Sequence, residues 1–307
     1  MAEPRLAGLE LGGTKCFALL AEGTRLIERV SVPTTTPEET LGRLDDLLGG
    51  WWAQAPFVAI GIGSFGPIGL DPARGDHGFI TTTPKPGWAN VEVLGRYERL
   101  FGVPVGFDTD VTGAALAEYL WGPAAGTTSN IYLTIGTGIG GGAVVNGTPL
   151  RGLLHPEMGH VRIRRRAGDG FAGVCPSHGD CLEGLASGPA IAVRAGAKAE
   201  TIGEDHPVWD DVAAEIAELV AMLVLTLSPQ RIAFGGGVPV GQPWLLPRIR
   251  ARAADILAGY VAPVDAAALE TIVAPAAFGA DAGPLGAIAL ADHARTGNVT
   301  PLSPPGG

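Results

Sequence analysis

Short apolar runs, separated by breaks that contain glycine, dominate the first third of the chain. Segments 5–11, 16–21 and 25–32 are rich in apolar and β-branched residues, with Gly-Gly-Thr and Glu-Gly-Thr between them. Runs of this length bounded by turn residues are typical of strands, so the pattern predicts a three-stranded meander. The next segments predict, in order, a helix over 37–48 with Thr36 as its N-cap, a strand over 57–62, a helix over 90–101, a strand over 103–107 and a helix over 111–120.

A second series of similar elements begins after the Gly-Pro-Ala-Ala-Gly break at 122–126. Strand 130–135, a glycine run, strand 142–145 and an Asn-Gly turn repeat the strand-turn-strand opening of the chain. The later segments predict helices over 182–195, 209–227, 243–258 and 281–294, with strands over 231–234 and 270–273. The repetition predicts two related α/β lobes, residues 1–121 and 122–280, followed by a disordered tail over 296–307.

The bulk composition restricts the class of partner. The chain has 307 residues, 46% of them apolar, and a formal charge of −10 from 21 Lys and Arg against 31 Asp and Glu. An acidic chain whose basic clusters are short is a poor match for nucleic acid. The sequence opens without a charged leader and apolar stretch, and it has no run of about 18 apolar residues. With only three cysteines, we expect an unexported, cytoplasmic protein with no membrane partner.

Four glycine-rich turns each follow an apolar strand and could bind phosphate. They lie at 12–15, 61–63, 136–142 and 235–237. Glycine lets backbone N–H groups approach an anion closely, and the alternative is four tight turns without a ligand. The turn at 136–141 matches the dinucleotide-binding Gly-x-Gly-x-x-Gly pattern, but strand residues follow it where that motif requires a helix. No P-loop pattern occurs.

Cys175, His178 and Cys181 offer three metal ligands at two successive x₂ spacings in a turn-rich segment. This local spacing is typical of a tetrahedral zinc site. His160 and His155 are the candidates for the fourth ligand. A site closed by four protein ligands would be structural, and it would hold loop 155–183 in place.

Carboxylates follow a predicted strand at Asp108-Thr109-Asp110. Asp108 or Thr109 can cap the next helix, which leaves the other acid free to act as a general base at the sheet edge. Glu157 and Glu183 lie within the loop that the metal would hold, and paired carboxylates suit a ligand with many hydroxyl groups.

Taken together, these segments resemble the ROK family of sugar kinases and repressors, from residue 8 to about 290. Segments 10–15 and 134–140 are similar to the family's two phosphate motifs, and 234–238 to its adenosine motif. His155-Pro-Glu-Met-Gly-His160, followed by the Cys-x₂-His-x₂-Cys run and Glu183, is similar to the zinc and sugar signature of the bacterial fructokinase branch.

The resemblance implies an actin-like pair of ribonuclease H-like lobes, with the active site in the interlobe cleft and helix 281–295 completing the first lobe. It implies a dimer that moves the γ-phosphate of MgATP to a hexose, fructose first, with structural Zn²⁺ on His160, Cys175, His178 and Cys181. Asp110 would be the catalytic base. The residues it assigns to the sugar are Gly66, Pro67, Thr109, Asp110, Glu157, His160 and Glu183. Those it assigns to ATP and Mg²⁺ are Glu10, Gly12, Gly13, Thr14, Lys15, Thr134, Gly136, Thr137, Gly138, Gly235, Gly236 and Gly237.

Two features depart from the family pattern. Most relatives carry Asn-Asp-x-Asn around the base, where this chain has Thr109-Asp110-Val111-Thr112, and Glu10 replaces a more usual Asp. The alternatives are a glucokinase, a mannokinase or an N-acetylhexosamine kinase of the same family. A ROK regulator without phosphotransfer is the non-enzyme alternative, against which stand the acidic charge and the position of the first phosphate motif at residue 10.

Overall fold

The computed structural model describes residues 3–297 and divides into two compact units. The first unit contains 3–120, 144–155 and 283–297, and the second contains 121–143 and 156–282. Segment 144–155, expected in the second lobe, groups with the first unit because Arg151 and His155 are bonded to residues there. The disordered tail was expected over 296–307, but Thr296 is the last residue of the final helix. Residues 298–307 lie outside the described part of the chain.

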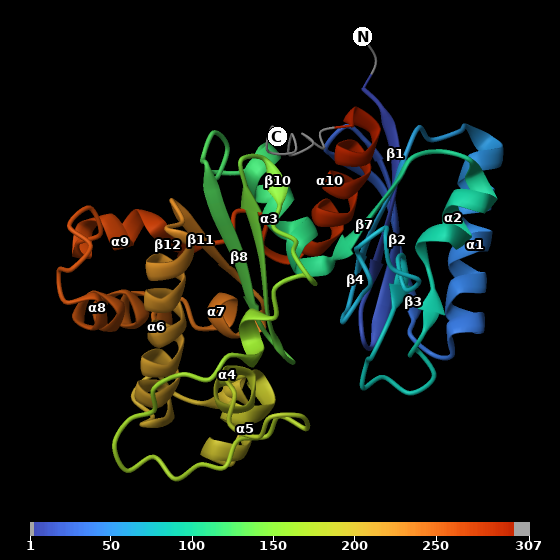
Figure 1. Ribbon diagram of the computed structural model, residues 1–307. Coiled ribbons are helices and arrows are strands. Elements are labelled where there is room, and N and C mark those ends of the chain that lie inside the picture. Colours follow the sequence, from blue (N-terminus) through green and yellow to red (C-terminus); the bar gives the residue numbers. More distant parts are fainter. Residues whose placement is uncertain (1–2, 298–307) are drawn as a thin grey trace. The chain divides into compact units, whose positions relative to one another are not determined.

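The first unit is built on a five-stranded sheet (Figure 1). Strands β1 (Arg5–Leu11), β2 (Lys15–Glu22) and β3 (Arg25–Pro33) form an antiparallel meander, which confirms the prediction from the apolar runs. Strands β4 (Ile60–Ser64) and β7 (Val105–Thr109) add in parallel, giving the order β3-β2-β1-β4-β7. Both parallel strands therefore end near the predicted functional residues.

Two helices of the first unit illustrate why its elements form where they do. Helix α1 (Pro37–Gln54) begins at the predicted cap, where the Thr36 hydroxyl accepts a hydrogen bond from Glu39 N at 3.3 Å. Helix α10 (Ala282–Thr296) lies directly on the sheet, since a Cβ at Gly61 would collide with backbone atoms of Ala287 and Ala291. The close approach needs glycine in the strand.

Smaller elements complete this unit. Helix α2 (Leu94–Phe101) begins later than predicted, because β6 (Val91–Glu92) pairs with β5 (Phe79–Ile80) instead of joining the helix. Helix α3 (Asp110–Trp121) follows β7 directly.

A second five-stranded sheet repeats this arrangement, and most of its residues lie in the second unit. Strands β8 (Ser129–Ile135), β9 (Ile139–Val145) and β10 (Thr148–Pro149) are antiparallel, and β11 (Arg231–Gly235) and β12 (Val273–Pro275) add in parallel to β8. The order β10-β9-β8-β11-β12 is the topology of the first sheet. The internal repetition predicted from the sequence is therefore confirmed at the level of topology.

The helices of the second unit are α4 (Leu182–Ala186), α5 (Gly188–Ala195), α6 (Val208–Leu227), α7 (Gly237–Gly241), α8 (Leu245–Leu257) and α9 (Ala266–Ile272). Figure 1 shows α6 in gold and α8 in orange beside this sheet. The prediction of one helix over 182–195 is wrong, because Ser187 has an extended backbone and its hydroxyl caps α5 through Ala190 N.

The predicted strand over 270–273 is also wrong in most of its length. Helix α9 continues to Ile272, and only Val273 of that segment belongs to a strand. The carboxylate of Asp265 accepts a hydrogen bond from Ala268 N at 2.8 Å and caps this helix. An acidic residue followed by three alanines was the signal for a helix start.

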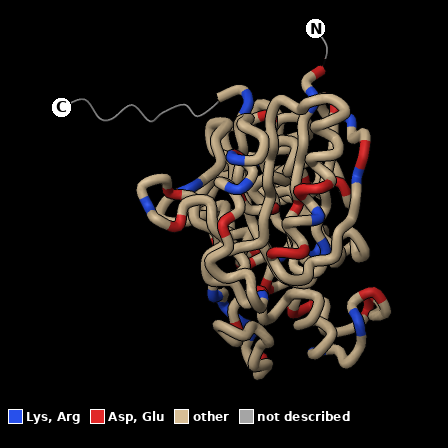
Figure 2. Tube along the Cα trace, turned by 90° about the vertical axis from the view of Figure 1, so that its right-hand side faces the viewer, with Lys and Arg blue, Asp and Glu red and all other residues tan. Residues whose placement is uncertain are grey.

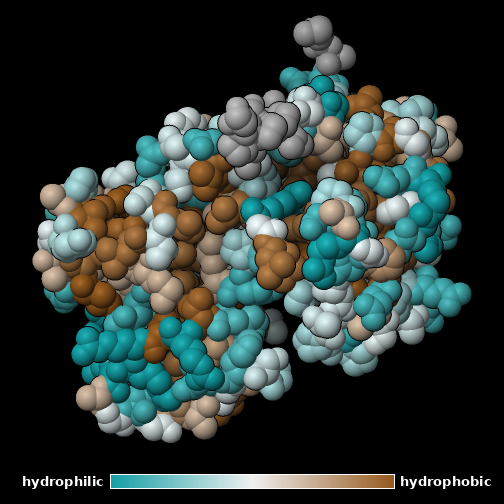
Figure 3. Space-filling model, in the orientation of Figure 1, coloured by the Kyte–Doolittle hydropathy of each residue, from teal (hydrophilic) through white to brown (hydrophobic). Residues whose placement is uncertain are grey.

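The surface carries charges of both signs. Figure 2 shows Lys and Arg interspersed with Asp and Glu along the chain. In Figure 3 hydrophilic residues cover the lower part of the second unit, where Figure 1 draws the long loop before α4. Within residues 3–297, no helix has both the length and the apolar character that a membrane span requires.

Candidate functional site

Three parallel strands of the first unit end side by side. Their register places Leu11, Ser64 and Thr109 next to one another. Glu10 precedes Leu11 and Asp110 follows Thr109, so both carboxylates are carried to the same edge. The carboxyl edge of parallel strands is where ligands of α/β proteins bind. Glu10 and Asp110 are therefore the candidate catalytic acids of this unit.

Asp110 is the first residue of α3 and has the properties of a base. Its Oδ1 accepts a hydrogen bond from Val111 N at 2.9 Å. Burial raises its pKa from 3.8 to about 6. A carboxyl group with this pKa is ionised at pH 7 and is a stronger proton acceptor than an ordinary aspartate.

Glu10 lies close enough to Asp110 for the two charges to interact. Burial, and then the negative charge of Asp110, raise the pKa of Glu10 to about 7, although Arg29 and Lys15 lower it. Its Oε2 is buried and has no hydrogen-bond partner among residues 3–297. A buried carboxylate oxygen in this state needs a donor or a cation, and oxygen ligands are those that Mg²⁺ prefers. The residue fits the expected magnesium role.

The structure settles which residue caps α3. The hydroxyl of Thr109 accepts from Thr112 N at 3.1 Å and donates to Thr112 Oγ1 at 2.7 Å. Asp108 is fully buried, and its Oδ2 accepts from Arg151 Nε at 2.8 Å. Asp110 is therefore the acid that neither caps α3 nor pairs with Arg151. The two threonines that depart from the family pattern are bonded to each other, so the hydroxyl of Thr109, an expected sugar contact, serves the helix cap.

The Gly66-Pro67 peptide, an expected sugar contact, is cis. The next backbone amide, of Ile68, donates to His155 Nε2 at 3.1 Å. His155 is 5% exposed. Because this histidine holds the loop after Pro67, it is not the fourth metal ligand that the sequence left open.

The first glycine turn joins β1 to β2. Gly12 O accepts a hydrogen bond from Thr34 Oγ1 at 2.7 Å, which fixes the turn. Gly13, Thr14 and Lys15 are exposed, and the Lys15 Nζ lies 5.1 Å from the Phe17 ring centroid. The turn therefore presents backbone and side-chain donors to solvent, as a phosphate loop requires.

The predicted metal ligands come together in the second unit. The ligand atoms of His160, Cys175, His178 and Cys181 all lie within 4.8 Å of one another. His160 Nδ1 is 3.8 Å from Cys175 Sγ and 3.5 Å from Cys181 Sγ, and His178 Nδ1 is 3.7 Å from Cys175 Sγ. Sulfur and nitrogen ligands at about 2.3 and 2.05 Å from a tetrahedral Zn²⁺ lie about 3.6 Å apart. The four residues fit zinc.

His160 lies between the predicted metal ligands and the carboxylate of Glu183. Its Nδ1 faces the two sulfurs, while its Nε2 lies 4.0 Å from Glu183 Oε1. Glu183 Oε2 accepts from Ile139 N at 2.9 Å, and a Cβ at Gly138 would lie 2.6 Å from this oxygen. The second phosphate turn is thus fixed by a carboxylate that the sequence assigned to the sugar. Glu157, exposed, begins the turn that ends at His160.

Ion pairs support the long loop before α4. Arg194 of α5, 6% exposed, bonds to Asp169 in the loop at 2.8 Å and to Glu215 of α6 at 2.8 Å. Arg165 pairs with Asp169 and Asp180 within the loop. The loop that carries three of the predicted metal ligands is therefore connected to both helices independently of the metal.

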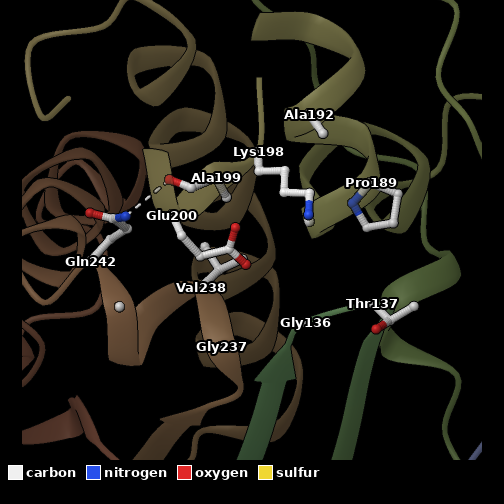
Figure 4. Close-up of a pocket in the computed structure, with 12 residues that line it drawn as sticks. Gly136, Thr137, Pro189, Ala192, Lys198, Ala199, Glu200, Gly237, Val238 and Gln242 are labelled. Atoms are coloured by element: carbon white, nitrogen blue, oxygen red, sulfur yellow. Dashed lines mark hydrogen bonds between the residues drawn. The ribbon is translucent and has the colours of Figure 1, made fainter. Parts of the chain in front are cut away.

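A cavity of about 470 Å³ lies in the second unit beside the second phosphate turn (Figure 4). Gly136, Thr137 and Gly237 line it, which brings predicted phosphate and adenosine residues to one place. Thr134, a predicted ATP residue, lies opposite Gly235 in the register of β8 with β11.

Sequence reasoning missed the charged residues of this cavity. Figure 4 shows the side chains of Lys198 and Glu200 turned into the same space, while Gln242 donates to Ala199 O at 3.1 Å. Both charged residues are exposed and lie in or next to a short 3₁₀ turn, Ala199–Thr201. No motif marks them, because only the fold brings this turn to the glycine loops.

Two sheets of identical topology, each opening with an antiparallel meander and continuing in parallel, define the class of actin-like ATPases. The chain belongs to the ROK family, whose profile matches residues 6–294. It is 43% identical over 292 residues to the fructokinase of Zymomonas mobilis, covering 92% of this chain and 95% of that protein. It is 41% identical over 292 residues to the fructokinase of Pediococcus pentosaceus, covering 94% and 98%.

Among solved structures, the ROK hexokinase of Thermus thermophilus is similar to this chain. The TM-score is 0.77 at 30% sequence identity, and the match covers 94% of this chain and 98% of that one. The fold and family inferred from the sequence motifs are confirmed.

Proposed function

We propose that the protein is an ATP-dependent fructokinase that forms fructose 6-phosphate. The observation that carries this proposal is the similarity, above 40% identity and over more than nine-tenths of the chain, to proteins named fructokinase. The site supports it, because the chain has a candidate base, glycine turns for phosphate and carboxylates suited to a polyol.

Asp110 is the proposed general base. Its pKa of about 6 leaves it ionised at neutral pH, so it can accept the proton of a sugar hydroxyl as the oxygen attacks phosphorus. Asp108 and Thr109 hold the preceding strand end through Arg151 and Thr112, which fixes the direction of the base. Positioning of this kind supplies most of the rate in phosphoryl transfer.

Sugar recognition is assigned to Glu157, His160 and Glu183 of the second unit, and sugar contacts by Gly66, Pro67 and Thr109 stay predictions from the sequence. A carboxylate accepts hydrogen bonds from adjacent hydroxyl groups, and Glu183 Oε1 is directed to His160 rather than to the backbone. His160 Nε2 remains available to a hydroxyl when Nδ1 binds the metal.

ATP is assigned to the cavity beside Gly136, Thr137 and Gly237, where backbone amides and Lys198 offer donors to phosphate. The remaining residues proposed for the nucleotide and its metal are Glu10, Gly12, Gly13, Thr14, Lys15, Thr134, Gly138, Gly235 and Gly236. When bound, Mg²⁺ would neutralise phosphate charge, with Glu10 as its carboxylate.

Zn²⁺ is the metal proposed for His160, Cys175, His178 and Cys181. Burial raises the pKa of the Cys181 thiol, so a cation is needed to keep it as a thiolate. All four ligands come from the protein, which makes the proposed role structural. The metal would fix His160 and, through it, the orientation of the sugar-binding ring nitrogen.

The experiment that tests the function is an assay of ADP release with MgATP against fructose, glucose, mannose and N-acetylmannosamine. We expect kcat/KM for fructose to exceed that for each other sugar by about tenfold or more. A preference for another hexose would show that the protein is a kinase for that sugar instead. No turnover with any of the four sugars would refute the proposal. Dimerisation, a cytoplasmic location and the absence of a nucleic-acid partner stay predictions from the sequence.

A further inference from the structure

The carboxyl group of Glu10 lies against the first turn of α10. A Cβ added to Gly283 would lie 2.6 Å from Glu10 Cδ and 3.0 Å from Oε2, and closer still to Oε1. All three atoms of the carboxyl group therefore share the space that any side chain at 283 would need. Both residues belong to the first unit.

The contact that a Cβ at Gly283 would make differs from the contact that a Cβ at Gly286, further along α10, would make. A Cβ at Gly286 would meet backbone atoms of Gly113 and Ala114 at 2.6 Å, where nothing can give way without moving a helix. At Gly283 the three nearest atoms all belong to the end of the flexible Glu10 side chain. A methyl group there would move Glu10 and leave the backbone in place.

No hydrogen bond holds the buried oxygen of Glu10. Its Oε2 has no hydrogen-bond partner within residues 3–297, and the neighbouring Asp110 repels it when both are ionised. The surrounding space therefore limits where the carboxylate can lie. Glutamate also reaches about 1.5 Å further than aspartate, so the longer acid needs room that the shorter one does not.

We propose that Gly283 is a positioning residue for the reaction, because its missing side chain leaves the space in which Glu10 is set beside Asp110. The longer acid at 10 and the glycine at 283 form one steric pair. This inference rests on the proposed kinase function, in which Glu10 serves the magnesium-bound nucleotide.

The test compares Gly283→Ala, Glu10→Asp and the double variant with the wild type, and uses Gly42→Ala as a matched control. Gly42 is also a helical glycine, but a Cβ there meets nothing within 4 Å. We expect Gly283→Ala to keep the wild-type Tm, because alanine favours helix and only a side chain must move. Its kcat should fall about 10- to 100-fold, the cost of a catalytic group displaced by roughly 1 Å.

The decisive measurement is the double variant. In the Glu10→Asp background the shorter acid leaves room for the methyl group, so Gly283→Ala should change kcat by less than about twofold there. Mn²⁺ titration in the presence of ADP gives a readout without turnover. Mn²⁺ affinity should fall about fivefold or more in Gly283→Ala and show no further loss in the double variant relative to Glu10→Asp.

Equal losses from Gly283→Ala in both backgrounds, or none in either, would overturn the inference. So would unchanged Mn²⁺ affinity in Gly283→Ala. If the wild type transfers no phosphate, the proposed function is refuted. The Mn²⁺ titration would then still test whether Gly283 and Glu10 act as a steric pair.

Discussion

Replacing Asp110 by asparagine should abolish turnover and at the same time stabilise the fold. Asparagine keeps the side-chain oxygen that accepts from Val111 N at 2.9 Å, and it removes the charge. The substitution therefore isolates the effect of one buried negative charge. Loss of the base should lower kcat by about 10²- to 10⁴-fold.

The magnitude of the stabilisation follows from the pKa of Asp110, which burial raises from 3.8 to about 6. A rise of about 2 corresponds to roughly 3 kcal/mol of free energy that the ionised group costs the folded state, as an upper limit. The unfolded pKa is the lower one, so this cost is absent below about pH 4 and fully present above about pH 6. Asp110→Asn should thus be about 1–3 kcal/mol more stable than the wild type at pH 7.5, with the difference vanishing near pH 4.

Urea unfolding of both proteins at pH 7.5 and pH 4.5 measures these differences. Asp108→Asn is the matched control, because Asp108 lies two residues away and its charge is paired with Arg151. That control should lose about 1–3 kcal/mol at pH 7.5, since it removes the charge of a buried carboxylate that is paired with Arg151. A stability gain for Asp110→Asn that is equal at both pH values, or no gain at pH 7.5, would show that burial of the charge is not the cause.

Three further predictions concern the second unit. Cys181→Ser should abolish the metal, measured as about one zinc per chain in the wild type, and lower the Tm by several degrees; retained zinc would contradict the assigned ligand set. Lys198→Ala should raise the KM for ATP about 3- to 10-fold with little change in kcat. Glu200→Gln removes a negative charge from the same cavity and should not raise the KM for ATP. Steady-state kinetics at varied ATP concentration measures both effects. Gly236→Ala should lower the free energy of unfolding in urea by about 3 kcal/mol or more, because φ is +88° and a Cβ would lie 2.6 Å from Ile135 N. A Cβ at Gly237 would meet nothing within 4 Å, so Gly237→Ala should change the free energy of unfolding by less than about 1 kcal/mol. Equal effects of the two substitutions would refute the steric argument.

Local patterns accounted for most of the elements and for the metal ligands. The meander, the Thr36 cap and the repeated sheet opening were predicted from apolar runs and turn residues, because those signals act between residues close in sequence. Cys175, His178 and Cys181 were found for the same reason, since their spacing alone brings them together. The errors at 182–195 and 270–273 came from capping signals at Ser187 and Asp265 that were present in the sequence but not used.

Pairings between distant residues could not be predicted. Nothing in the sequence indicates that Arg151 bonds Asp108, or that His155 holds the amide of Ile68 rather than a metal. Lys198 and Glu200 carry no motif, and their role follows only from the cavity that they line.

The sequence by itself indicated the family, the two repeated sheets and the local metal cluster, because each depends on residues within short segments. The base, Asp110, came only from the resemblance to the family and stays a proposal. Only the tertiary structure decided that Thr109 rather than Asp108 caps α3, which oxygen of Glu183 holds the turn at 136–139, and that Gly283 lies against the carboxyl group of Glu10. These features depend on the packing of segments tens to hundreds of residues apart, and the space between two packed elements is a property of neither sequence segment alone.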